Sequence, residues 1–147
     1  LNILVDKDGK VFMGMDNQQD MLTVIQDIND RCGLELTAQE MKKFQTDPLW
    51  GIRMTSLKGY LGLPTEKMTE TITGPEAGIP LDSIDGGKSE FQLWVTAATD
   101  VKDDMKIAIK ADSQTPYANI KKVMSELQDM DQNRYYLITT LKTGSEE

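Results

Sequence analysis

Few residues of this chain could do chemistry, because its 147 residues include no histidine and one cysteine, Cys32. Without histidine there is no Ser-His-Asp or Cys-His nucleophile system and no imidazole ligand for a metal. A single cysteine forms neither an internal disulfide nor a Cys-x-x-Cys zinc site. These absences exclude most familiar active sites. They favour a domain that is not an enzyme and that needs no metal and no cofactor.

Two short motifs begin like ligand sites but have the wrong spacing. Residues 87–89 (Gly-Lys-Ser) end like a phosphate-binding loop, yet the glycine required five positions earlier is Asp82. Residues 6–9 (Asp-Lys-Asp-Gly) begin like a calcium loop, yet Lys10 and Val11 stand where a ligand and a glycine are needed. We therefore interpret the serine as a helix cap and residues 6–9 as a turn. Carboxylate pairs for acid–base catalysis arise by chance among 24 acidic residues and predict nothing.

Charge and hydropathy limit the possible partners. The chain has 16 Lys+Arg and 24 Asp+Glu, a net charge of −8, which disfavours binding to nucleic acid or to an anionic membrane surface. Residues 106–147 are neutral, with six basic and six acidic residues, and are the expected contact surface. The longest apolar run, 135–138, has four residues, whereas a membrane span needs about 20. Because the chain begins at Leu1, we expect it to be part of a longer protein.

The first thirty-three residues predict a hairpin and a helix. Two runs of alternating apolar residues flank Asp8-Gly9, a pair that favours a tight turn. A helix is expected after Asp16-Asn17, with an apolar stripe every three to four residues and Gly33 at its end. Cys32 lies on this stripe, and we interpret it as a core residue rather than a reactive thiol.

The last forty residues predict a strand, a helix and a second strand. Residues 107–111 alternate in the manner of a strand. Thr115-Pro116 is expected to cap and open an amphipathic helix. Residues 134–140 are rich in β-forming residues. A right-handed crossover through the helix would make the two strands parallel neighbours.

The middle segment, 34–105, predicts short helices. Thr37 and Glu40 fit a capping box, and further helices are expected at 56–61, from Pro64, and after Ser89. Its large apolar residues are too numerous for a disordered loop, so we expect the segment to pack on the core. These residues are Trp50, Leu57, Leu61, Leu63, Phe91, Leu93 and Trp94.

Together these elements predict one α/β (α+β) domain over residues 1–147. A small mixed sheet would combine the N-terminal hairpin with the C-terminal strand–helix–strand unit, with helices on one face. Residues 34–105 would form a mostly helical insertion.

The final strand is the predicted interaction site. It is rich in β-forming residues, it lies in the neutral part of the chain, and a last strand tends to leave one edge unpaired. No charged residue and no proline between Tyr135 and Leu141 protects that edge. A second copy would bury it in a homodimer, or an extended peptide would add to the sheet. The predicted interface residues are Tyr135, Tyr136, Leu137, Ile138, Thr139, Thr140 and Leu141.

The two ends of the chain share a distinctive order of residues with a known family. The blocks are residues 2–14 (NILVDKDGKVFMG), 106–112 (KIAIKAD), 115–117 (TPY), 123–124 (VM) and 137–139 (LIT). This order resembles the periplasmic domain of the ExbD/TolR family. The family core would be residues 1–33 and 106–142. Residues 78–83 (GIPLDS) and Leu93-Trp94 are similar to an insertion carried by some longer members.

The resemblance implies a function in energy transduction. Family members are inner-membrane proteins with one N-terminal transmembrane helix and a periplasmic domain that is dimeric. They work with an ExbB-like channel partner and a TonB-like protein to use the proton gradient in transport at the outer membrane. The membrane helix, its proton-carrying Asp and the Leu-Pro linker motif are absent from this sequence, so no motor residue is carried over. Contact with a membrane would occur only through that missing helix. The alternative is a free-standing adaptor or small-ligand-binding α/β domain.

Overall fold

The computed structural model describes residues 1–47, 49–75, 77–81, 88–101, 105–132 and 135–140. Four strands lie in these ranges: β1 (Asn2–Val5), β2 (Val11–Gly14), β3 (Ile107–Asp112) and β4 (Tyr135–Thr140). Six helices accompany them: α1 (Gln18–Cys32), α2 (Ala38–Thr46), α3 (Met54–Leu61), α4 (Thr65–Ile72), α5 (Glu90–Val101) and α6 (Tyr117–Gln128). No described helix has the length and apolar character needed to cross a membrane.

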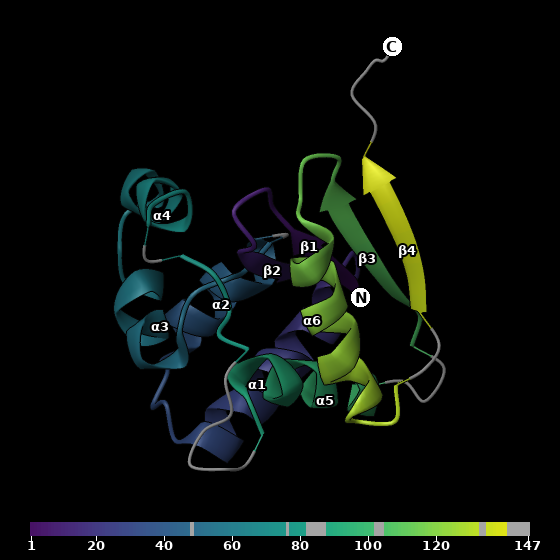
Figure 1. Cartoon of the computed structure of the whole chain (residues 1–147). Helices are drawn as coiled ribbons and strands as arrows, with labels where there is room; N and C mark the ends of the chain where they lie inside the picture. Colours follow the sequence, from purple (N-terminus) through teal and green to yellow (C-terminus); the bar gives the residue numbers. More distant parts are fainter. Residues whose placement is uncertain (48, 76, 82–87, 102–104, 133–134, 141–147) are drawn as a thin grey trace.

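The strands form one mixed sheet in the order β2-β1-β3-β4 (Figure 1). β1 pairs antiparallel with β2 and parallel with β3, and β3 pairs parallel with β4. The predicted α/β class, hairpin and parallel C-terminal strands are therefore confirmed. The position of β1 was not predicted. Asn2 pairs with Gly14 on one side and with Ala108 on the other, so the hairpin joins the C-terminal unit through β1.

The Asp6 carboxylate organises the turn between β1 and β2. The Asp6 carboxylate accepts hydrogen bonds from the backbone N–H of Asp8 and of Lys10, at 2.9 and 2.8 Å. Gly9 has a φ of 83°, which a side chain tolerates poorly. A Cβ there would also lie 2.6 Å from Nδ2 of Asn119. The predicted turn is confirmed, and the positive φ is the main reason for a glycine there, because the Asn119 side chain could move aside.

The predicted ends of α1 and the capping box of α2 are both present. Asn17 caps α1 by accepting from the backbone N–H of Gln19 and Asp20, and Gly33 ends the helix with a φ of 62°. Thr37 and Glu40 form the reciprocal capping box. These local signals are strong because each satisfies backbone groups that the helix leaves free.

The middle segment packs on the core, as predicted. Phe44, Trp50 and Trp94 form an aromatic cluster, with ring centroids 4.9 to 5.6 Å apart. Trp50 also pairs with Met13 as an isolated bridge, at 2.7 and 2.8 Å, so the segment contacts the sheet beside β2. The buried residues of 34–105 join the same core cluster as those of β1, β3 and α1.

The cap predicted for α6 is wrong. Pro116 occupies the N-cap position, without a side-chain hydrogen bond. The Thr115 hydroxyl donates instead to the carbonyl of Val5, at 3.2 Å. A buried hydroxyl needs a partner, and Thr115 finds it in β1 rather than in its own helix. Thr115 therefore ties the start of α6 to the sheet.

Candidate interaction surface

β4 is one of the two edge strands of the sheet. It pairs with β3 along its whole length, from Tyr135 beside Ile107 to Thr140 beside Asp112. No other described strand pairs with its second edge. In Figure 1, β4 bounds the molecule on the side away from α3 and α4, and no helix is drawn beyond it. Because successive residues of a strand direct their backbone groups to opposite edges, every second residue of β4 offers its N–H and C=O outward.

Three side chains of β4 are exposed, and they lie on both faces of the sheet. Register with β3 places Leu137 on the face of Ile109, which is buried, and Tyr136 and Ile138 on the opposite face. Even so, the exposed fractions are 63% for Tyr136, 45% for Leu137 and 47% for Ile138. Three consecutive large apolar side chains therefore meet solvent along an unpaired edge, an arrangement that soluble proteins usually avoid.

The face of the sheet opposite the core is also partly exposed, and it carries both apolar and charged residues. Tyr136 and Ile138 lie beside Ala108 and Lys110 of β3. In turn, Lys110 lies beside Leu4 of β1. Leu4 and Ala108 are partly exposed and Lys110 is exposed. We call residues Leu4, Ala108, Lys110, Tyr136 and Ile138 the open face.

The predicted interface residues fall into three groups. Tyr136, Leu137 and Ile138 are exposed. Tyr135 is half-buried, packs against the core, and its hydroxyl accepts from Gln128 at 3.4 Å. Thr139 and Thr140 lie in β4, and Leu141 lies outside the described residues. The sequence does not predict a role for the other members of the open face, Leu4, Ala108 and Lys110, because each is only one member of an alternating strand pattern.

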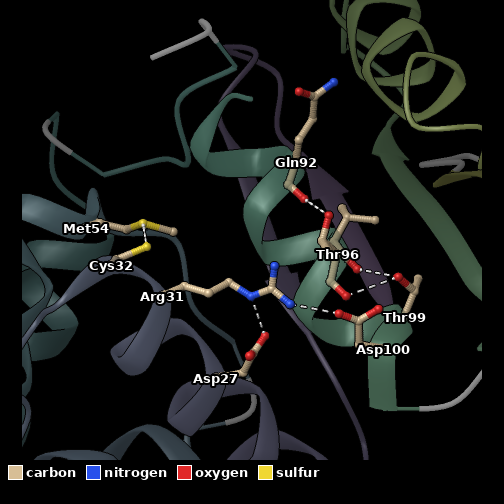
Figure 2. Close-up of polar contacts among 9 residues, drawn as sticks. Asp27, Arg31, Cys32, Met54, Gln92, Thr96, Thr99 and Asp100 are labelled. Carbon is tan, nitrogen blue, oxygen red and sulfur yellow. Dashed lines mark hydrogen bonds and ion pairs between the residues drawn. The ribbon is translucent and has the colours of Figure 1, made fainter. Parts of the chain in front are cut away.

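Cys32 lies at the margin of the core rather than inside it. Its thiol donates to the sulfur of Met54 at 3.5 Å (Figure 2). Burial, reinforced by the charge of Glu90, raises the pKa of the Cys32 thiol. Figure 2 shows the neighbouring Arg31 directed instead to Asp27 and Asp100, each at 2.8 Å. The prediction of a core residue is therefore confirmed only in part, because Cys32 packs against the core cluster but remains partly exposed.

The remaining candidate motif is a helix cap. Ser89 is buried, and its hydroxyl oxygen accepts from the backbone N–H of Gln92 at 3.1 Å. The same hydroxyl donates to the Glu126 carboxylate at 2.7 Å, which joins the start of α5 to α6. Gly87 lies outside the described residues. Among the described residues, no group of three or more His, Cys, Asp or Glu side chains is arranged to hold a metal ion.

Comparisons of the chain with models of protein families, with curated proteins and with solved structures find no match. The function must therefore be argued from the residues and from the geometry of β4.

Proposed function

We propose that this chain is a partner-binding domain of the ExbD/TolR type, without catalytic activity, that associates through β4. The observation that carries the proposal is the edge of β4, which is unpaired within the described residues and exposes Tyr136, Leu137 and Ile138. In the parent protein, the domain would lie in the periplasm, attached to the inner membrane by a helix outside this sequence. Its partners would be a second copy, a TonB-like protein and an ExbB-like channel.

The arrangement of the resembling blocks supports this proposal. Residues 2–14 supply β1 and β2, residues 106–112 include β3, residues 123–124 lie in α6, and residues 137–139 lie in β4. Blocks from the two ends of the chain thus meet in one sheet. This proximity is what a shared core with a long insertion would require.

Two modes of association are available to β4. Two antiparallel copies of the strand would continue the sheet across a two-fold axis and cover both unpaired edges. Alternatively, an extended TonB-like peptide would add as a fifth strand, with backbone hydrogen bonds giving affinity and alternate side chains meeting Leu137 or Ile138. The lack of net charge in residues 106–147 favours both modes, because the rest of the chain repels its own copies.

Sedimentation of the wild type and of two β4 variants tests this proposal. We expect the wild type to dimerise, and Thr140→Lys to be monomeric because a lysine on the edge opposes a partner strand. Ile138→Pro should also be monomeric, since proline is poorly tolerated in a strand ladder. Thr55→Lys, which makes the same change at an exposed position of α3, is the control and should still dimerise.

Peptide binding is followed separately by amide signals. A TonB-like peptide should shift the signals of residues 135–141 in the Thr55→Lys control more than in Thr140→Lys. If the wild type stays monomeric at every accessible concentration and these signals do not shift when the peptide is added, the proposed β4 interface is wrong.

The structure also offers an argument for the alternative, a small-ligand-binding domain. A pocket of about 310 Å³ lies between α2, α3 and α4. This volume is at the lower end for small-molecule sites.

A further inference from the structure

The pocket between α2, α3 and α4 combines an apolar wall with a carboxylate. One face of α4 lines it with residues three and four positions apart, among them Met68 and Ile72, and Leu49 adds to the apolar part. The polar part includes Asp47, which follows the last turn of α2, and Tyr60 of α3. In Figure 1, α3 and α4 lie on the far side of the molecule from β4, so this site is independent of the proposed interface.

Asp47 is half-buried without a cation to balance its charge. Its carboxylate accepts from the backbone N–H of Leu49 at 3.2 Å and from the Tyr60 hydroxyl at 3.5 Å. No described lysine or arginine forms an ion pair with it. Burial raises the pKa of the Asp47 carboxyl, which is the direction expected for a charge that has lost water without gaining a counter-ion.

The other polar groups also favour a cation. Burial, together with the charge of Asp47, raises the pKa of Tyr60 to about 12, so its phenol stays neutral and its oxygen can accept a hydrogen bond. The carboxyl-terminal end of α2 points a negative helix dipole at Asp47. Lys43 also lines the pocket, but its ammonium is held by the carbonyl of Leu63 at 2.6 Å.

We propose that this pocket binds a primary alkylammonium group, with the ammonium on Asp47 and Tyr60 and the aliphatic stem along Met68 and Ile72. The ammonium supplies the missing counter-ion, and the stem covers apolar surface that α4 leaves open. Two sources share this chemistry, namely a free aliphatic amine and the side chain of a lysine in a peptide.

Titration of the full chain with n-butylammonium chloride tests the site. We expect saturable shifts of the amide signals of Asp47, Leu49, Tyr60 and the first turns of α4. n-Butanol has the same stem without the charge and should bind at least about tenfold more weakly, the loss typical of a charged hydrogen bond. Nα-acetyl-lysine N-methylamide separates the two sources. Binding comparable to that of n-butylammonium supports a peptide lysine, and much weaker binding supports a free amine.

A matched pair of variants separates the pocket from the general negative charge of the chain. Asp47→Asn should weaken n-butylammonium binding about tenfold or more, because it keeps the shape and the acceptor for Leu49 but removes the charge. Asp30→Asn makes the same change at an exposed position of α1 and should leave binding unchanged. Amide spectra show whether each variant is folded. If a variant is unfolded, the comparison of n-butylammonium with n-butanol on the wild type tests whether binding depends on the ligand's charge. Equal binding of n-butanol, equal weakening by both variants, or no saturable shift would overturn the proposal.

Discussion

Trp94 is among the largest fully buried side chains of the core. Its ring is fully buried, stacks on Phe44 at 5.6 Å with an interplanar angle of 7°, and contacts Trp50. Trp94→Ala should lower the free energy of unfolding by about 3–5 kcal/mol, because it removes a large side chain from a close-packed cluster. Urea unfolding followed by circular dichroism measures the change. Trp94→Phe keeps an aromatic ring on Phe44 and should cost clearly less, and equal costs would contradict the role of the stack.

Glu40 should make stability depend on pH. A hydrogen bond from the Lys58 ammonium, followed by that from the backbone N–H of Thr37, lowers the pKa of the Glu40 carboxyl from 4.5. A carboxyl whose pKa falls on folding stabilises the folded state above its unfolded pKa, and this stability is lost as the pH falls through the folded value. Glu40→Gln should therefore be less stable than the wild type at pH 7, by about 0.5 kcal/mol. The difference should vanish in acid, where both side chains are neutral.

A double-mutant cycle isolates the Lys58 contribution to this effect. Lys58→Gln alone should cost about as much as Glu40→Gln, and the double variant should cost little more than either. Additive losses at pH 7 would show that the 2.8 Å contact between Lys58 and Glu40 contributes nothing to stability.

Among the elements, α5 should be as stable as the sheet. Trp94, Val95 and Ala98 are fully buried, and Ser89 and Gln92 both bond to Glu126 of α6. Native-state hydrogen exchange should therefore give the amides of α5 the same opening free energy as those of β3, because neither exchanges without global unfolding. Amides of α4, an outer helix with one buried residue, should exchange at lower cost and serve as the comparison. Exchange of α5 at the level of α4 would show that the middle segment opens independently.

The sequence predicts the elements well where a local signal sets them. Each confirmed signal acts within a few positions of the chain, either by accepting or donating a backbone hydrogen bond or by bending the backbone. These signals are Asp8-Gly9, Asn17, Gly33 and the Thr37–Glu40 capping box. Thr115 was misassigned because its partner, Val5, lies far away in the chain. The central place of β1 was missing for the same reason, since pairing between distant strands depends on how the whole core packs.

The two candidate sites differ in how far the sequence reveals them. An edge without charge or proline is visible at 135–141, so the candidate strand could be named in advance. The sequence does not predict that Leu137, on the core side of the sheet, is exposed, because its exposure depends on where the helices lie over the sheet. The sequence does not predict which residues line the pocket, because Asp47, Tyr60 and Ile72 lie in or beside three different helices and form no motif.

For the whole molecule, association should strengthen with salt. The chain has a net charge of −8, so two copies repel one another, whereas the exposed residues of β4 are uncharged. Raising NaCl from about 20 to about 300 mM shortens the range of this repulsion, and the dissociation constant of the dimer should fall. Sedimentation equilibrium of the wild type at the two salt concentrations measures it. A dimer that weakens with salt would indicate an interface held by ion pairs and not by β4.

The central position of β1 also fixes an order of events during synthesis. β1 is made first, and β2 can pair with it almost at once. Its other partner is β3, where Asn2 pairs with Ala108, so the middle of the sheet cannot form until residues 107–112 have been synthesised. A two-stranded hairpin alone is only marginally stable in water. The first of the four strands therefore waits for the third, and we expect the sheet to form slowly and only after residues 107–112 have been synthesised.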